Sequence, residues 1–511
     1  MLKFCYNSVR NGGSFVVKKQ YNLIKDEILY FVSEFKKLLI PISILTGLYI
    51  LSFSAILRAN FNYIDDIGRV HAGYKGWEYY SRYLSNFLSR FFSTGNYLTD
   101  VSPLTQIVAC VFLAVSGAVT IYVISGKTKF SVWQYISAMF FGITPFFLES
   151  ISYKYDSPYM ALSILAMVLP LFFFKGDNYV FYGLTVFVGT LAMCTTYQAA
   201  SGIFPAFVAL LIFKMWNECE KKKKILYFLT TSVAGYLIGL IFFRAFIMVP
   251  ADNYASTSMP PLSQLVPTVI NNMEKYYKAI PALFRPEWMI LIVLLCMSFV
   301  YVAVRDSKRK KYVAFPIVLI ILAFMFIICI GVYLALAKPI FACRARSGFG
   351  AVLALIAVFA TSARKAYWTR IVSFSLCWVF VVFSFSYGNA LNVQKEYTDY
   401  RISATIDDLM ELGLLDGEET KIVQISGSIH EAPILRNIPQ DYPLLDELLP
   451  TTYSYSHWQW GGYQFLHYYG LKNIKTDATL ELLGFDLPVV LDNQYHTIKS
   501  DGKYILIELK S

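Results

Sequence analysis

Residues 103–124 read PLTQIVACVFLAVSGAVTIYVI, an apolar run without a charged side chain. As an α-helix this run rises roughly 30 Å, which is about the thickness of the hydrocarbon core of a bilayer. Similar runs recur along the 511 residues, of which 56% are hydrophobic and 15% are charged. A water-soluble protein could not bury that much apolar surface, so the sequence predicts a polytopic α-helical membrane protein.

We expect about eleven transmembrane helices along the chain. The predicted spans are 38–57, 103–124, 132–148, 159–174, 179–194, 200–216, 225–249, 288–304, 312–335, 348–363 and 370–388. Several are shorter than about 20 residues, which tilted or partly buried helices tolerate. Because about 37 polar and basic residues precede the first span, we expect that span to be a retained anchor and not a cleavable signal peptide.

Basic residues are distributed unequally between the two sides of the predicted bundle. The loops on one side carry 23 Lys and Arg, whereas the longer loops on the other side carry twelve. Basic loops stay in the cytoplasm, so residues 1–37 form a cytoplasmic segment, and an odd number of spans places the C-terminus outside. The same topology signal explains the net charge of +11 without a nucleic-acid partner. The predicted outer loops are 58–102, 149–158, 195–200, 250–287 and 336–347.

Residues 389–511 differ in composition from the transmembrane region 38–388, because they hold nine basic and eighteen acidic residues. A helical pattern at 405–412 is followed by strand-like runs at 421–425 and 504–509. We therefore expect a small C-terminal α/β domain on the extracytoplasmic side. Four of its aromatic residues could stack on a sugar or form the core of the domain: Trp458, Trp460, Tyr463 and Tyr468.

The first outer loop carries adjacent carboxylates, Asp65 and Asp66, directly after the first predicted span. A carboxylate with reduced access to water can remove a proton from a sugar hydroxyl or help hold a divalent cation. A solvated turn is an equally good interpretation of the pair. Further along this loop, apolar residues recur at helical spacing over 77–92, which predicts an amphipathic helix on the membrane surface.

Ionisable residues also concentrate in later outer loops. The second outer loop contains Glu149, Lys154 and Asp156, which could bind phosphate and sugar hydroxyls or pair with one another. The fifth outer loop holds Arg344 and Arg346, which suit bidentate binding of a phosphate or snorkelling to lipid headgroups.

Uncharged hydrogen-bonding groups, Tyr197 and Gln198, occupy the third outer loop, and the fourth is long enough to act as a lid. Eight cysteines and five histidines are scattered without metal-ligand spacing, so we predict no metal centre. The sequence contains no P-loop, no dinucleotide-binding glycine motif after a strand and no GxSxG, so nucleotide-driven transport and α/β-hydrolase chemistry have no support.

The stretch NYIDDIGR at 62–69 resembles the serotype-converting O-antigen glucosyltransferases of the Gtr type-II-like family. The same resemblance extends to Glu149 with Tyr153-Lys154-Tyr155-Asp156, to Tyr197-Gln198, and to Lys338 with Arg344-x-Arg346-Ser347-Gly348. It implies a GT-C glycosyltransferase in the bacterial cytoplasmic (inner) membrane. It also implies a polyprenyl-phosphate sugar donor, glucose as the sugar and lipopolysaccharide O-antigen as the glycan acceptor. We expect no cofactor, and a divalent cation at the carboxylate pair remains an open alternative.

Together with this resemblance, the loop residues suggest an inverting displacement of the donor phosphate by an acceptor hydroxyl. The candidate catalytic residues are Asp65 or Asp66 as general base and Glu149. The candidate substrate-binding residues are Arg69, Lys154, Asp156, Tyr197, Gln198, Arg344 and Arg346. Among these, Arg344, Arg346 and Lys154 would bind the phosphate and stabilise the charge that it gains on leaving.

Two alternatives remain open at the level of sequence. A transferase of the same class could move another sugar or glycosylate a wall polymer. A flippase or transporter for a lipid-linked sugar would instead carry ionisable residues inside its spans, and Arg244 within the predicted span 225–249 is the clearest residue of this kind.

Overall fold

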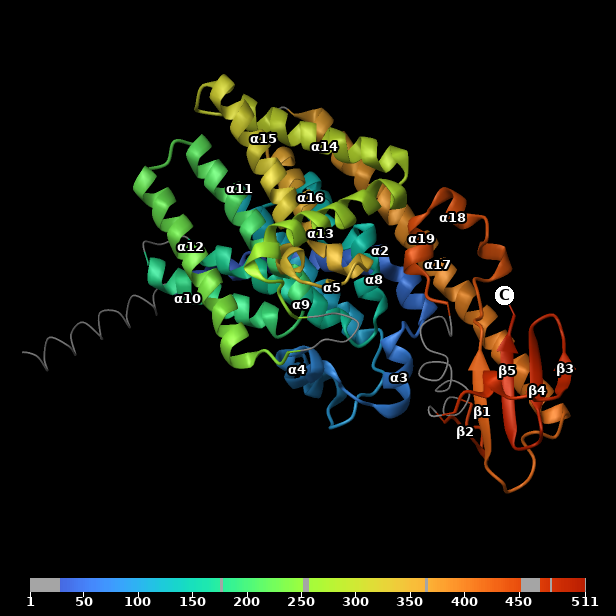
Figure 1. Ribbon diagram of the computed structural model, residues 1–511. Helices are drawn as coiled ribbons and strands as arrows, with labels where there is room; N and C mark the ends of the chain where they lie inside the picture. The colour runs from blue at the N-terminus through green and yellow to red at the C-terminus, as the bar shows by residue number, and fades with distance from the viewer. Residues whose placement is uncertain are drawn as a thin grey trace, which may run out of the picture.

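A computed structural model describes residues 28–174, 178–250, 257–363, 366–451, 469–477 and 480–510. Figure 1 shows a bundle of helices that is continued at one end by the long helix α17 (Tyr367–Glu411) and a small β-sheet. The aromatic residues considered for sugar stacking, Trp458, Trp460, Tyr463 and Tyr468, lie outside the described residues.

Eight helices in the described part of the chain are long and apolar enough to cross a membrane. They are α2 (Leu39–Ala59), α5 (Leu104–Ser125), η3 with α11 (Gln198–Gly202 and Ile203–Asn217), α12 with η4 (Lys222–Phe242 and Phe243–Ile247), α14 (Pro286–Arg305), α15 (Lys311–Ile328), η6 with α16 (Cys343–Arg346 and Ser347–Thr361) and α17. The molecule therefore has the architecture predicted for a polytopic membrane protein.

Three of the eleven predicted spans correspond to helices that are bent or short. The first begins with α6 (Val132–Ala138) and α7 (Phe140–Ile143) and bends by 61° into α8 (Pro145–Ser152), because Pro145 cannot continue the hydrogen bonding of a straight helix. The two short helices are α9 with η2 (Ser157–Val168 and Leu169–Phe173) and α10 (Tyr179–Cys194). By length and apolar character the described residues thus form eight spanning helices, or nine with the bent pair, where the sequence predicts eleven.

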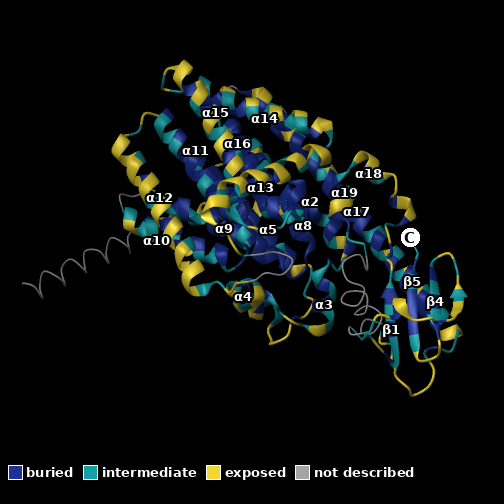
Figure 2. Ribbon diagram, in the orientation of Figure 1, coloured by how far each residue is buried: buried dark blue, intermediate teal, exposed yellow. Residues whose placement is uncertain are grey.

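Burial separates the centre of the bundle from its surface. The apolar window of α16 is 89% buried, whereas those of α12 and α15 are only 22% and 17% buried. Figure 2 shows exposed residues along these outer helices and buried ones around α5 and α8. Exposed apolar surface of this kind is the part that a bilayer would cover.

Helices approach closely where glycine allows it, since a Cβ on Gly388 of α17 would lie 2.5 Å from the backbone of Ala55 in α2.

Five further helices lie outside the eight apolar ones and surround the site described below. They are α3 (Asp65–Ala72), η1 (Trp77–Tyr80), α4 (Tyr83–Ser93), α13 (Leu262–Leu283) and η5 (Gly331–Ala335). The amphipathic helix predicted over 77–92 is confirmed from residue 83 onward in α4, where Phe87 and Phe91 are exposed and Ser85 and Ser89 are buried, whereas residues 77–80 form the separate helix η1. The helix α13 occupies most of the fourth outer loop, the segment long enough to act as a lid.

The C-terminal region contains a five-stranded sheet with the order β2-β1-β5-β4-β3. The strands are β1 (Lys421–Ser426), β2 (Ile474–Lys475), β3 (Val489–Asp492), β4 (His496–Ser500) and β5 (Tyr504–Leu509), and η10 (Leu482–Gly484) lies between β2 and β3 in the chain. β1 pairs in parallel with β2 and β5, and β4 pairs antiparallel with β3 and β5. The two strands predicted at 421–425 and 504–509 are therefore confirmed and lie side by side.

The helix predicted at 405–412 is the end of the 45-residue helix α17, which begins inside the bundle. The expected domain boundary at residue 389 consequently falls within a continuous helix, and Ile402, Ile406 and Leu409 of that helix pack on the sheet. The chain then returns to the bundle through η7 (Pro433–Leu435), α18 (Ile438–Asp441) and α19 (Leu444–Leu448). The leucines of α19 are buried in the main core of the bundle.

Candidate active site

Asp66 is buried near the start of α3 and holds two segments of backbone in place. Its Oδ2 accepts hydrogen bonds from the N–H groups of Tyr63 (3.1 Å) and Lys154 (2.9 Å), and its Oδ1 accepts one from Tyr155 (3.4 Å). Burial raises the pKa of Asp66 to about 7, while Arg69 and the hydrogen bonds from the backbone act to lower it. Asp66 therefore fastens the first outer loop to the second.

Asp65, the first residue of α3, is half-buried, and its side chain makes no hydrogen bond or ion pair with any described residue. The preceding residue, Ile64, has a φ of 42°, a left-handed conformation that a β-branched residue rarely adopts. Backbone strain of this kind clusters at functional sites. Of the predicted carboxylate pair, Asp65 is thus the member that is free to accept a proton.

Arg69 and Asp156, both predicted to bind substrate, form a buried ion pair with each other. The Nε1–H group of Trp77 donates to Oδ1 of Asp156 at 2.5 Å, and the Arg69 guanidinium lies 4.6 Å from the centre of the Trp77 ring. These three side chains join α3, η1 and the start of α9. Because the two charges neutralise each other, the cluster is suited to positioning the loops.

Lys154 is also buried, and its ammonium group is occupied by the first outer loop. Its Nζ donates to Oδ1 of Asn62 at 2.8 Å and forms an ion pair with Oδ2 of Asp100 at 3.1 Å. A phosphate could bind Lys154 only in competition with Asp100.

Glu149, which is buried, and Arg344, whose side chain is 15% exposed, form a second ion pair, between α8 and η6. Oε2 of Glu149 also accepts the backbone N–H of Arg344 at 2.7 Å. The Arg344 guanidinium donates to the Tyr153 hydroxyl at 2.9 Å and lies 5.4 Å from the centre of that ring. The ring of Tyr63 packs edge-on against Tyr153 at 4.7 Å, so this ion pair is connected to the loop that carries the two aspartates.

Arg346 lies on the same 3₁₀ helix and reaches toward the C-terminal region. It pairs with Oε2 of Glu447 in α19 at 3.4 Å and lies 5.5 Å from the centre of the Phe146 ring. The Sγ–H group of Cys343 faces the same carboxylate oxygen at 3.4 Å. The three cations predicted to bind phosphate, Lys154, Arg344 and Arg346, therefore all have carboxylate partners in this structure.

Gln198 lines a groove of about 1000 Å³, open solvent included, and Tyr197 contacts Arg82, another lining residue of that groove. The side-chain NH₂ of Gln198 donates to the carbonyls of Tyr80 (3.2 Å) and Cys194 (2.8 Å), which fixes the mouth of this groove. The Arg82 guanidinium lies 4.7 Å from the centre of the Tyr197 ring. The two residues predicted from the third loop therefore have different contacts. Tyr197 packs its ring against the Arg82 guanidinium, and Gln198 donates hydrogen bonds to backbone carbonyls.

Sequence reasoning did not assign a site to Arg82 or connect it with Arg244, although both line this groove. Arg82 falls within the amphipathic pattern around α4, which concealed it, whereas Arg244 was associated only with the transporter alternative because it falls within an apolar run. A signal was present for Arg82, since basic residues are uncommon in loops predicted to lie outside the cytoplasm.

Metal-ligating side chains are not gathered in the described residues, where no group of three or more His, Cys, Asp or Glu could hold a metal ion. Of the carboxylate pair, Asp66 accepts hydrogen bonds from backbone N–H groups, and Asp65 has no partner in the described part of the chain.

Comparison with known proteins identifies the family. The family model described as glucosyl transferase GtrII matches residues 54–355, which is more than half of the chain. The chain belongs to the GtrII glucosyl transferase family. Over 440 residues it is 27% identical to a protein of Salmonella phage P22 described as an uncharacterized 55.3 kDa protein in the gtrB 5' region, covering 82% of this chain and 88% of that protein. No solved structure shows a significant match.

Membership of the GtrII family confirms the resemblance seen in the sequence and supports a glycosyltransferase that moves glucose. The matched range contains α3, the Glu149–Arg344 ion pair and the groove with its two arginines. It ends within α16, before α17 and the sheet. The residues considered as the site thus all lie in the part of the chain that defines the GtrII family.

Proposed function

We propose that the protein transfers glucose from a polyprenyl-phosphate donor to an extracytoplasmic glycan, lipopolysaccharide O-antigen, as an inverting enzyme of the GT-C class. Membership of the GtrII family supplies the sugar and the reaction type. The observation that carries the mechanism is the contrast between the two adjacent aspartates. Asp66 is fastened by three backbone amides, and Asp65 is left half-buried and without a partner among the described residues.

Asp65 acts as the general base in this proposal. It takes the proton of an acceptor hydroxyl while the hydroxyl oxygen forms a bond to the anomeric carbon of glucose. The bond between that carbon and the phosphate oxygen breaks, and the lipid phosphate leaves with the bonding electrons. A phosphate leaving group needs no general acid, so one carboxylate suffices for a single displacement with inversion.

The other polar residues hold this base and the sugar in position. Asp66 and the Arg69–Asp156 ion pair fix α3 against the second outer loop. The Glu149–Arg344 ion pair lies behind Tyr153 and, together with Lys154, provides charged groups to orient sugar hydroxyls. Residues held this firmly keep reacting groups in the productive geometry without reorganisation.

We place the protein in the bacterial cytoplasmic membrane with its N-terminus inside and its sheet outside. The basic connections α11–α12 and α14–α15 are neighbours, since the backbone N–H of Lys308 donates to the carbonyl of Asn217 at 3.2 Å. Figure 1 shows them at the end of the bundle opposite α3 and α4. A basic end opposite the candidate site supports an extracytoplasmic site under the positive-inside rule.

A flippase for a lipid-linked sugar is the alternative that one observation favours. The break of 61° before α8 places Glu149 on an interrupted helix, as is common in transporters. Detergent solution removes the two compartments that transport requires, so chemistry in detergent separates the two functions.

The deciding experiment is glucose transfer by the purified protein in detergent, from polyprenyl-phosphoglucose to isolated O-antigen, with and without EDTA. We expect transfer by the wild type and at least a ~10³-fold loss in Asp65→Asn, as expected for removal of a general base. Full activity of Asp65→Asn would refute the assigned base. A folded wild type that fails to transfer from glucose, mannose or arabinose donors would favour the flippase.

A further inference from the structure

We propose that the groove lined by Arg82 and Arg244 binds the phosphate and the first part of the chain of a lipid-linked phosphate. This inference rests on the proposed donor chemistry and assigns the donor to a place in the fold. The apolar walls would hold the hydrocarbon chain, and the two guanidinium groups would hold the phosphate.

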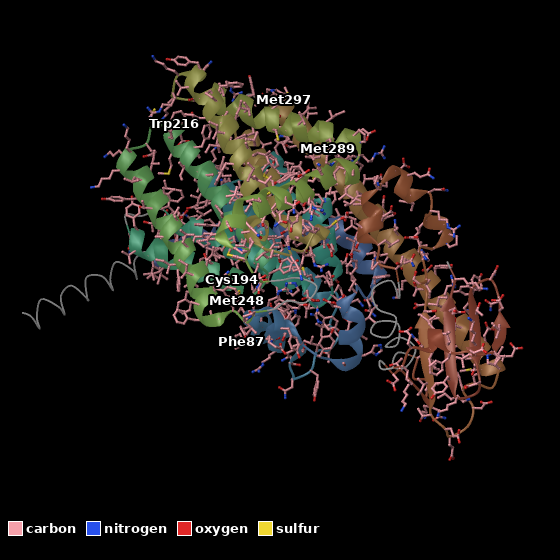
Figure 3. The ribbon with its side chains drawn as sticks, in the orientation of Figure 1. Phe87, Cys194, Trp216, Met248, Met289 and Met297 are labelled. Carbon is pink, nitrogen blue, oxygen red and sulfur yellow. The ribbon has the colours of Figure 1, made fainter. Side chains whose placement is uncertain are left out.

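The groove has the composition that such a ligand requires. It has a volume of about 1000 Å³, open solvent included, and lies between the ends of α10 and α12, η5 and the segment from η1 to α4. Apolar side chains dominate its lining: Met193, Leu240, Phe243, Met248, Val332 and Leu336. Figure 3 shows Cys194 and Met248, two points on the lining, close together above Phe87 of α4. A ligand that fills this space must be mainly hydrocarbon.

Arg82 is a cation with unused hydrogen-bonding capacity at this groove. Its Nε atom is buried and has no hydrogen-bond partner among the described residues. Its guanidinium lies over the rings of Tyr197 (4.7 Å) and Tyr80 (5.3 Å), and within the described ranges it forms no ion pair with a carboxylate. An arginine held between aromatic rings with its donors free suits a phosphate oxygen.

Arg244, a second lining residue of the groove, supplies the second charge. It lies on η4, the π-helical end of α12, and forms no ion pair with the described part of the chain. Its helix neighbours Ile241 and Phe246 are 66% and 76% exposed, as expected for lipid-facing residues. A guanidinium among such residues is costly unless it meets an anion, and the phosphate of a membrane lipid is available at that depth.

The groove also adjoins the candidate active site. Burial raises the pKa of the Tyr197 phenol well above its usual value; Tyr333 and Glu149 raise it further, whereas Arg344 and Arg82 lower it. The geometry agrees, because the Arg82 guanidinium lies 4.7 Å from the centre of the Tyr197 ring, and η3, which begins directly after Tyr197, contacts η6, the helix that carries Arg344.

This assignment replaces the cations expected from sequence as the primary phosphate contacts. Lys154, Arg344 and Arg346 each have a carboxylate partner that a phosphate would have to displace. Arg82 and Arg244 have none among the described residues, so phosphate binding there breaks no existing ion pair.

The test measures binding of unglycosylated polyprenyl phosphate to the full-length protein in detergent. The variant is Arg82→Gln with Arg244→Gln, and the matched control is Arg90→Gln, an exposed arginine on α4. Loss of two charge-assisted contacts should raise the Kd at least about tenfold, whereas the control should stay within about twofold. An excess of phosphatidylglycerol should not compete; if it does, the groove binds bulk phospholipid and the inference is wrong.

A second measurement keeps the inference testable if the double variant does not fold. Polyprenyl phosphate with a photoreactive group near the phosphate should label Met248 or Leu240 in the wild type, and labelling confined to other helices would overturn the inference. The proposed function is tested separately by Asp65→Asn, which should bind the lipid like the wild type. Wild-type transfer together with unchanged binding in the double variant would retain the function and refute this site.

Discussion

Glu149 and Arg344 are 195 residues apart in the sequence and form a largely buried ion pair in which the carboxylate also accepts the backbone N–H of Arg344 at 2.7 Å. The pair joins the bent helix α8 to η6. Removing one partner would leave the other charge buried without compensation, whereas removing both would not. The Glu149–Arg344 ion pair therefore stabilises the fold around the site and also places two charged groups there.

Single substitutions of this pair should therefore cost more stability than the double substitution. We expect Glu149→Gln and Arg344→Met each to lower the free energy of unfolding by about 3 kcal/mol, and the double variant by less than the sum. Thermal unfolding in detergent, followed by intrinsic fluorescence, measures the three values. Additive losses would show that the two side chains do not interact.

Asp66 should make stability depend on pH. Its pKa is raised from 3.8 to about 7 by burial, so the folded state binds more protons than the unfolded state between these values. The stability contribution of protonated Asp66 is fully present below about pH 4 and is lost as the pH rises through about 7. In Asp66→Asn the decline between about pH 4 and 7 should be smaller than in the wild type.

Unfolding midpoints of the wild type and Asp66→Asn at several pH values test this, with Asp65→Asn as the matched control. Asp65→Asn removes the neighbouring carboxylate, whose side chain has no partner among the described residues, and so separates the effect of Asp66 from that of losing any charge on α3. Equal profiles in all three proteins would contradict the burial of Asp66.

The hydroxyls of Tyr63 and Tyr387 both donate to the carbonyl of Leu448, at 2.9 Å and 3.2 Å, and so fix α19 to the bundle. Replacing both tyrosines by Phe leaves that buried carbonyl without these donors, at a cost of about 2 kcal/mol. We expect faster cleavage by a protease near α19. Tyr79→Phe, at a residue that is 68% exposed, is the control and should be cleaved at the wild-type rate.

Gly388 marks a close approach of α17 to α2. Replacing it by Ala places a methyl group 2.5 Å from the backbone of Ala55, so we expect a loss of roughly 2 kcal/mol or more and a lower yield of folded protein. Gly47 on α2 has no atom within 4 Å of the position that a Cβ would take, and Gly47→Ala should be neutral or stabilising. Size-exclusion profiles and unfolding midpoints compare the two; equal behaviour would refute the tight packing.

The apolar runs could be located from the sequence because transfer into a bilayer depends on local composition and length. The same local logic found the strands at 421–425 and 504–509 and the aromatic face of α4. The predicted count of about eleven spans stays a prediction, since α10 and the segment from α9 to η2 are apolar but short. The bend before α8 escaped this local logic, because the length of the apolar run concealed the effect of Pro145.

Asp65 and Asp66 show what the sequence left open. They are adjacent and chemically identical, yet the contacts of Asp66 with the backbone of residues 154 and 155 come from a loop 88 and 89 residues away. Which carboxylate is fastened therefore depends on how two outer loops meet. The carboxylate partners of Arg344 and Arg346 were hidden for the same reason, since they are 195 and 101 residues distant.

The sequence by itself thus determined the class of the protein: a polytopic membrane chain with a small C-terminal sheet and the loop motifs of the GtrII family. Local hydrophobicity and short motifs suffice for these, because each depends on neighbouring residues. Only the tertiary structure decided which charges are paired, which carboxylate is free among the described residues and that Arg82 and Arg244 share one groove. Ion pairs and grooves form between distant segments, and their energies depend on burial that no single segment encodes.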